Sequence, residues 1–532
     1  MSSHSSDRWS SRTGLILAVA SGAIGLGNFL RFPGQAVQYG GGAFMVPYII
    51  SFLILGIPVV FAEWIVGRMG GERGFHSYPL LFQNILTGVP LRLLGALGVV
   101  VPILIYVYYV FVESWCLAYA FKFLNALLFP ATTPAFETSS GQVSKSVVAY
   151  FTEYFLNFTG AKQNGSSFET GILTFTLICV GMNFILVYRG LSKGLEFFSK
   201  LAIPLMIGFS TIILVRVLTL DHISLGLGKM WNPDWEKLLH PEVWIAAAGQ
   251  IFFSLSTGFG IALVFSSYLS RKDDLALSSL SSASINEFCE VIFGGLITIP
   301  IAFLFLGDEI GSFGTFGMGF ISLPSVFTIM PFGNFFGFFW YLVLFLAALT
   351  SSITMLQPGL IFLQEGLGLS KKTGILLLLV FTISLTLPII YFNKEFNALD
   401  FTDFFIGTIL IYVLAMAQIW VFKKKIGVDS ALEYGYIGSH IRFPKILNFT
   451  LKYITPYFLL LVFILFCVFN APEYWKKLNL ENSIQKALAE GGTLEDGFTN
   501  AWVCRSVLLV FGFIFTGAYF LVDHALKRSK AQ

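Results

Sequence analysis

The sequence predicts an all-α membrane protein that crosses the bilayer twelve times. Of its 532 residues, 56% are apolar and 12% are charged, whereas a soluble domain carries about 25% charged residues. Apolar runs of roughly 20 residues, the length of a membrane-spanning helix, recur along the whole chain. No linker rich in Pro, Gly or Ser separates them, although a soluble chain of this length would divide into several domains. The net charge of +3 gives no reason to expect nucleic acid as a partner.

The first span follows a short polar segment, residues 1–12, which lacks the pattern of a cleavable signal peptide. We therefore expect the first span to be retained. Lys and Arg concentrate in the termini and in every second loop, and such residues gather on the cytoplasmic side of membrane proteins. Both termini are expected in the cytoplasm and the protein in the plasma membrane. The expected spans cover residues 13–36, 41–69, 89–124, 167–187, 191–216, 241–268, 276–306, 337–368, 372–393, 399–424, 446–470 and 499–525.

Clusters of Gly and Ser interrupt the first and the sixth span in the same way. The sequence is GAIGLGNFLRFP at 22–33 and GQIFFSLSTGFG at 249–260. An interior Gly costs a helix about 1 kcal/mol relative to Ala, although one such cluster alone fits close packing between helices. Two clusters five spans apart favour two five-helix repeats of inverted topology. In such folds the first helix of each repeat unwinds in mid-membrane, and its free backbone groups bind substrate and ions.

Six segments carry a resemblance to a known family: GAIGLGNFLRFP (22–33), GGGAFMVPYI (40–49), YYVFVESW (108–115), VWIAAAGQIFFSLSTGFG (243–260), SINEFCEVI (284–292) and LAALTSSI (346–353). From about Trp9 to its end, the chain resembles the neurotransmitter:sodium symporters, above all bacterial amino-acid members such as the leucine transporter. The resemblance implies a core of two inverted five-helix repeats, 13–216 and 217–424. It also implies two peripheral helices and a cytoplasmic tail within 425–532.

The resemblance implies two sodium sites as well. Sodium prefers neutral oxygen ligands, and residues of this kind occupy the matching positions. Thr350 and Ser351 taken alone would more often bond back to their own helix, but together with Ala347 they share one helix face. The first site would comprise Asn28, Ser254, Asn286 and the Ala23 carbonyl, and the second Thr350, Ser351 and the carbonyls of Ser21, Ile24 and Ala347.

The expected substrate is a neutral, mostly apolar L-amino acid. Monoamine members of the family carry Asp where this chain has Gly25, so the substrate's own carboxylate would complete the first sodium site. The amides of Leu26 and Gly27 and the hydroxyl of Tyr109 would bind that carboxylate. No charged side chain is expected in the pocket, which disfavours charged substrates. The remaining pocket positions are Ala23, Ile105, Phe253, Ser254, Ser256, Phe259, Ser351 and Met355, with Thr354 nearby.

Two gates are expected, one on each side of the pocket. Arg31 would pair with Asp403, or with Asp400 as the alternative, above Phe253 and beside Gln250. The inner gate is less well defined, because the Arg of the family is Ser6 here. The nearby cation is Arg8, and its candidate partners are Ser267, Tyr268, Gln357 and Glu365.

Glu290 is expected to replace chloride. Chloride-dependent relatives carry a neutral Ser at this position, and Glu290 follows Asn286 by one helical turn. A fixed carboxylate there would offset the sodium charge and could take a proton on the return step. The alternative is a Glu that is hydrogen-bonded between helices. Glu63 and Glu113 are expected to be structural, bound by backbone or hydroxyl groups.

Other classes of function fit the sequence less well. A membrane enzyme would need a P-loop, a metal-ligand cluster or a GxSxG-type nucleophile, and the sequence contains none of them. A channel would need a continuous polar path, whereas Phe253, Phe259 and Met355 are expected to block the pocket. A nutrient sensor that binds without transporting, or a sodium permease of another family with this fold, remains open, as does the choice between monomer and dimer.

Overall fold

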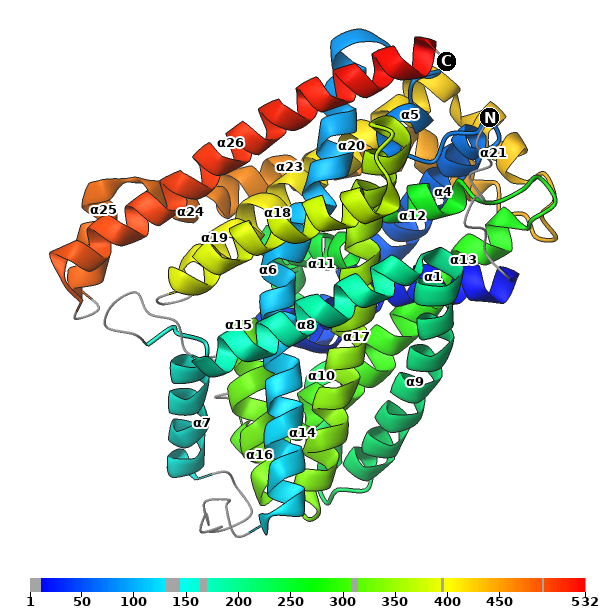
Figure 1. The fold of residues 1–532 in the computed structure, drawn as a ribbon. Coiled ribbons are helices and arrows are strands. Elements are labelled where there is room, and N and C mark those ends of the chain that lie inside the picture. The colour runs from blue at the N-terminus through cyan, green and yellow to red at the C-terminus, as the bar shows by residue number, and fades with distance from the viewer. Residues whose placement is uncertain are drawn as a thin grey trace.

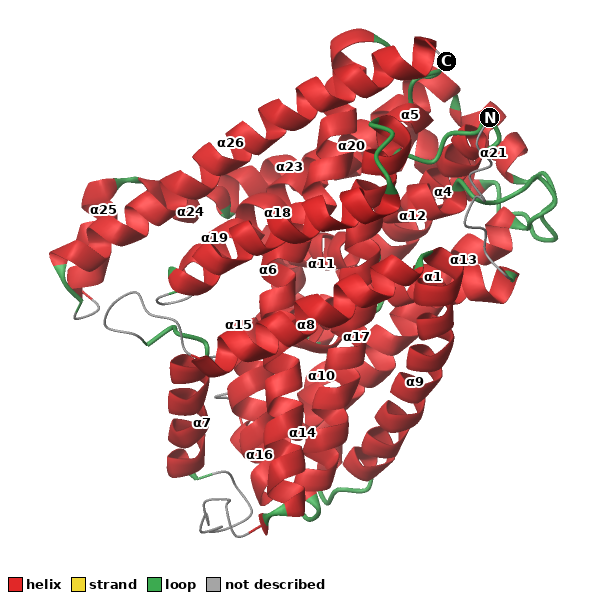
Figure 2. Cartoon of the chain, viewed as in Figure 1, coloured by secondary structure: helices red, strands yellow, loops and turns green. Residues whose placement is uncertain are grey.

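The structure is a computed structural model that describes residues 11–130, 144–162, 170–307, 314–393, 397–489 and 492–531. Every regular element within these ranges is a helix (Figure 2). This confirms the all-α prediction. The first and last described segments lie toward the same end of the molecule (Figure 1).

Within the described ranges, ten helical stretches are long and apolar enough to cross a membrane. An eleventh span is a pair of helices, Arg12–Ala23 (α1) and Gly27–Gln38, that bend by 49° at a short break. The ten stretches are Gly42–Gly71, Gly88–Leu128 (α6), Gly171–Arg189, Leu191–Leu218, Leu275–Leu306, Gly333–Gly366, Lys371–Tyr391, Asn397–Ile426, Ile446–Phe469 and Leu494–Ala531 (α26).

The remaining expected span is the sixth along the chain, 241–268. It is divided into two short helices, α11 (Pro241–Ser254) and α12 (Ile261–Ser266). Neither is long enough to qualify as a span by itself. The backbone between them is left-handed, with φ of 51° at Ser256, 80° at Gly258 and 75° at Gly260. An α-helix requires φ near −63°, so the Gly and Ser cluster ends one helix and begins another, as the sequence predicts.

Short helices occupy parts of the loops that were expected to connect the spans. They include Lys145–Phe158 (α7), Ile223–Trp231 (α10), Leu323–Ile329 (α16), Ala471–Leu478 (α24) and Leu480–Ala489 (α25). In α7, three aromatic or aliphatic residues on one face are buried, at Val147, Phe151 and Phe155. This i, i+4, i+8 spacing forms the apolar stripe of a helix that lies on a protein surface.

The spans differ in how deeply they are buried. In the most apolar 18 residues of each span, the buried share is 89% in α6 and 78% in Gly333–Gly366. The same share is 11% in α26. The α6 helix packs along α17 (Gly333–Ile361) at the centre of the molecule. The α26 helix runs along the outside (Figure 1). The residues expected to bind substrate and sodium on α6 and α17 therefore belong to the two most deeply buried of these ten stretches.

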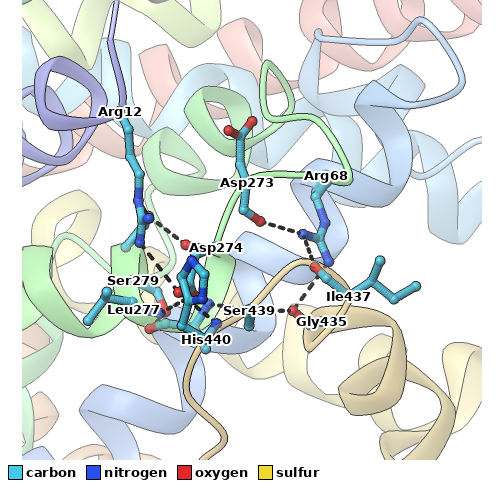
Figure 3. Close-up of polar contacts among 12 residues, drawn as sticks. Arg12, Arg68, Asp273, Asp274, Leu277, Ser279, Gly435, Ile437, Ser439 and His440 are labelled. Carbon is cyan, nitrogen blue, oxygen red and sulfur yellow. Dashed lines mark hydrogen bonds and ion pairs between the residues drawn. The ribbon is translucent and has the colours of Figure 1, made fainter.

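A buried arginine, Arg68, joins several elements by hydrogen bonds on the face where α1 begins (Figure 3). Arg68, at the end of α4 (Ile57–Gly71), is fully buried and donates to four backbone carbonyls, those of Asp273, Tyr434, Gly435 and Ile437. Nearby, Asp274 accepts from the amides of Leu277 and His440 and lies 3.5 Å from Arg12. This network ties α1 and α4 to the loops before α13 (Leu275–Phe288) and after α21 (Val428–Gly435).

Candidate substrate and sodium site

The break in the first span lies between Ala23 and Gly27, and its backbone groups bond to other parts of the site. The Gly25 amide donates to Asn28 Oδ1 at 2.8 Å, and the Leu26 amide donates to Tyr109 Oη at 2.9 Å. The Ile24 carbonyl accepts from Ser351 Oγ at 3.1 Å. Because the helix opens here, backbone groups that would otherwise bond within it are available to α6 and α17.

The break in the sixth span faces the break in the first. Ser256 Oγ donates to the Gly22 carbonyl at 3.3 Å, which joins the two breaks directly. On the other side, the Gly258 amide donates to Glu63 Oε1 at 2.9 Å. Glu63 thus satisfies an amide freed by the break, which is the structural role expected for it.

The three side chains expected at the first sodium site meet in one buried cluster. Asn28 Nδ2 donates to Asn286 Oδ1 at 3.0 Å, and Asn286 Nδ2 donates to Ser254 Oγ at 2.7 Å. Glu290 joins them, because it accepts from Asn28 Nδ2 at 2.9 Å and from the Ser254 hydroxyl. Gln250 Nε2 donates to the other carboxylate oxygen at 2.8 Å. The cluster therefore combines neutral oxygens with one carboxylate, a donor set that suits a small hard cation.

The residues expected at the second sodium site meet in two hydrogen-bonded pairs. Ser351 Oγ donates to the Ile24 carbonyl, and Thr350 Oγ1 donates to the Ala347 carbonyl at 2.9 Å. Ser21, whose carbonyl was the expected ligand, has its hydroxyl 2.7 Å from that of Ser199. Each of the two expected hydroxyls therefore bonds to one of the three expected carbonyls.

Two of the expected substrate positions, Tyr109 and Ser351, lie against Gly25. A Cβ added at Gly25 would lie 2.6 Å from Tyr109 Oη and 2.7 Å from Ser351 Oγ, so no side chain fits there without a rearrangement. Ile105, Phe259 and Met355 are buried, and the Phe259 ring packs edge-to-face on Phe253 at 6.3 Å.

A cavity of about 580 Å³ leads to this site from one side. Arg31, Phe253, Asp400 and Asp403 all line it. The Arg31 guanidinium lies 4.4 Å from the centre of the Phe253 ring, and Tyr108 Oη donates to Asp403 at 2.7 Å. No ion pair joins Arg31 to either aspartate in the described part of the chain. The outer-gate residues are therefore gathered around an open cavity rather than closed over it.

His76, to which no role was assigned from the sequence, contacts three of the residues considered for the inner gate, namely Ser267, Tyr268 and Glu365. His76 stacks on Tyr268 with ring centres 4.1 Å apart, and its amide donates to the Glu365 carboxylate. Arg8, the cation expected at the inner gate, lies outside the described residues. No periodicity or motif distinguished His76, since its partners are almost 200 and 300 residues away in the chain.

Two further residues of the site were not singled out from the sequence. Tyr48 Oη donates to Glu287 at 2.5 Å, one turn from Glu290, and Ser199 bonds to Ser21. Tyr48 lies within the segment 40–49 that resembles the family, so the resemblance could have pointed to it. Ser199 lies outside every such segment, and nothing in the sequence distinguishes it. Glu113 makes a hydroxyl bond of the kind expected for it, because its carboxylate accepts from Ser352 Oγ at 2.5 Å and also from Asn183.

The fold and the site define a membrane transporter built around two broken helices. Residues 6–485 match the Sodium:neurotransmitter symporter family. The fold is similar to the crystal structure of MhsT in complex with L-phenylalanine, with a TM-score of 0.74 and 26% identity over 86% of this chain and 99% of that one.

Curated relatives agree with this assignment. An uncharacterized sodium-dependent transporter of Methanocaldococcus jannaschii is 28% identical over 80% of this chain and 84% of its own length. The sodium-dependent serotonin transporter of Drosophila melanogaster is 27% identical over 86% of this chain and 76% of its own length. The chain belongs to the sodium:neurotransmitter symporter family. It is a sodium-dependent symporter and a multi-pass membrane protein, not an enzyme.

Proposed function

We propose that this symporter carries neutral, mostly apolar L-amino acids by alternating access, without chloride. The surroundings of Gly25 carry the proposal. Tyr109 and the Leu26 amide meet beside a position too crowded for an acidic side chain. The substrate itself must then bring the carboxylate that a monoamine lacks. The relative crystallised with L-phenylalanine supports an amino acid of this class.

Two sodium ions would drive accumulation. Moving one charge through 100 mV is worth about 2.3 kcal/mol, and a tenfold concentration gradient adds about 1.4 kcal/mol. Two ions thus provide roughly 7 kcal/mol, enough for about 10⁵-fold accumulation of a zwitterion. One ion would bind among Asn28, Ser254 and Asn286, and the other beside Thr350 and Ser351.

The experiment is uptake of a radiolabelled amino-acid panel into proteoliposomes, with an inward sodium gradient and with potassium or choline instead. We expect sodium-dependent uptake of Leu, Met or Val, with aromatic residues also accepted and decarboxylated analogues excluded. Asn28→Ala and Thr350→Ala should weaken sodium and substrate binding together. Thr382→Ala is the matched control, since its buried hydroxyl bonds only within its own helix. Uptake that persists in choline, or tight binding of a monoamine, would contradict the proposal.

The same measurement separates the alternatives. A nutrient sensor would bind amino acids without accumulating them, and a channel would pass substrate-gated current that is uncoupled from sodium. We further propose a plasma-membrane location with cytoplasmic termini, in keeping with the distribution of Lys and Arg.

Independence from chloride rests on Glu290. Its carboxylate is fully buried and touches both Asn28 and Ser254, so it supplies a fixed negative charge beside the first sodium site. Glu290→Ser should make uptake depend on chloride, measured with chloride replaced by gluconate. Glu287→Gln is the control, since Glu287 is a neighbouring carboxylate that bonds to Tyr48 instead. If the wild type loses activity in gluconate, or if Glu290→Ser ignores chloride, Glu290 has a different role.

A further inference from the structure

We propose that His76 is a positioning residue that holds the transport pathway shut on the face where α1 begins, by joining the end of α12 to the end of the long central helix. This inference rests on the proposed alternating-access function. It assigns a role to a side chain in the loop between α4 and α5 (Tyr78–Leu81).

The imidazole holds the segment that follows α12. It stacks on the Tyr268 ring at 4.1 Å and 6°, and Nδ1 lies 2.9 Å from Ser267 Oγ. The Ser267 hydroxyl already donates to the Val264 carbonyl at 2.6 Å. A hydroxyl has one hydrogen to give, so Nδ1 must be the donor in this contact.

The backbone of the same residue holds the central helix. The His76 amide donates to both Glu365 oxygens, at 3.1 Å and 2.9 Å, and the Ser77 amide donates to Oε2 at 2.5 Å. Glu365 lies in η9 (Phe362–Gly366), which continues α17. Two elements far apart in the chain are thus bound to one short loop.

The two attachments act at the ends of elements that the transport cycle must separate. The α12 helix follows Gly258 and Gly260, whose left-handed backbone forms the break in the sixth span. A short helix with a break at one end and an attachment at the other can swing only when the attachment is released. The Ser267 and Tyr268 contacts are that attachment.

A cavity of about 490 Å³ lies against these contacts, and Leu15, His76 and Tyr268 line it. Glu365 accepts from the His76 amide, and Arg12 and Asp273 line the cavity wall together with Tyr268. Arg12 is engaged by Asp274 at 3.5 Å and by Ser278 at 3.2 Å. Burial lowers the pKa of His76 to about 4. The closure therefore uses neutral hydrogen bonds and stacking rather than an ion pair at His76.

The test measures access to the cavity in the full-length protein in nanodiscs, with sodium and without substrate. Leu15→Cys serves as the reporter, because Leu15 lines the cavity and is 1% exposed. Cys467→Ser removes the native cysteine that is exposed. We expect His76→Ala to raise the rate of maleimide labelling at the reporter by about fivefold or more. His76→Asn, which keeps a donor near Nδ1 but cannot stack, should give an intermediate rate. His240→Ala, at an exposed histidine before α11, should leave the rate unchanged.

Sodium binding gives a second measurement. A population shifted toward the open inner pathway should bind sodium more weakly, because a smaller fraction of the protein occupies the binding-competent conformation, while the total number of sodium sites at saturation stays the same. A labelling rate in His76→Ala equal to that of the parent would overturn the inference. If His76→Ala fails to fold, the labelling rate of His76→Asn tests the inference instead. A rate in His76→Asn equal to that of the parent would also overturn it. No substrate is present, so an error in the proposed substrate class would leave this result intact and would appear only in the uptake panel.

Discussion

Replacing Gly25 by Ala tests the most crowded point of the site. The added Cβ would lie 2.6 Å from Tyr109 Oη and 2.7 Å from Ser351 Oγ, whereas an ordinary contact is 3.4–4 Å. Relief requires the tyrosine hydroxyl to move by about 0.8 Å, judged against normal carbon–oxygen contact. Its bond from the Leu26 amide, now 2.9 Å, would then lengthen beyond hydrogen-bonding distance.

Gly25→Ala lowers stability and substrate affinity in two ways, by crowding and by the loss of the hydrogen bond from the Leu26 amide to Tyr109. A buried amide left without an acceptor loses about 1–3 kcal/mol, and overpacking in a filled core adds about 1–3 kcal/mol. Because each 1.4 kcal/mol is a factor of about ten, we expect substrate affinity to fall at least thirtyfold. The amide and hydroxyl that shift are those proposed to bind the substrate carboxylate, so the loss should appear in binding as well as in stability.

Binding of radiolabelled substrate to purified protein, with thermal unfolding in parallel, measures both quantities. Gly181→Ala is the matched control, since no atom lies within 4 Å of the added Cβ in α8 (Thr170–Arg189). That change should be neutral or stabilise by up to about 1 kcal/mol. Adding Tyr109→Phe to Gly25→Ala should recover the stability lost to crowding but not the part lost with the Leu26 hydrogen bond, and it should not recover binding. Unchanged substrate affinity in Gly25→Ala would refute the reasoning.

Three further outcomes are expected. Arg68→Met should lower stability by about 3 kcal/mol or more, measured by thermal unfolding, because four buried carbonyls lose a charged donor. Glu113→Ala should cost about 1–3 kcal/mol for each buried donor it leaves without an acceptor, with the sodium dependence of uptake unchanged. The pKa of His76 is depressed to about 4 in the closed form from about 6.5 in water, so the open form binds more protons. Acidification from pH 7 toward pH 5 lowers the thiolate fraction of any cysteine and with it the rate of maleimide labelling. The opening should therefore appear as a labelling rate at the Leu15→Cys reporter that falls less on acidification than it does in His76→Asn.

The sequence by itself determined the membrane-spanning helices and the two breaks. Hydrophobic length and Gly or Ser clustering are local properties, because a helix in lipid must satisfy its own backbone. The meeting of Asn28, Ser254 and Asn286, the side chains proposed for the first sodium site, was also predictable, since they lie in segments that resemble the family.

Only the tertiary structure decided which groups pair across the molecule. His76 and Glu365 are 289 residues apart, and Tyr108 and Asp403 are 295 apart, so no local pattern specifies either contact. Thr350 and Ser351 are adjacent in sequence, yet one bonds back to its helix and the other reaches the broken first span. Hydrogen bonds depend on distances of about 3 Å, and such distances between remote segments are set by how the helices pack.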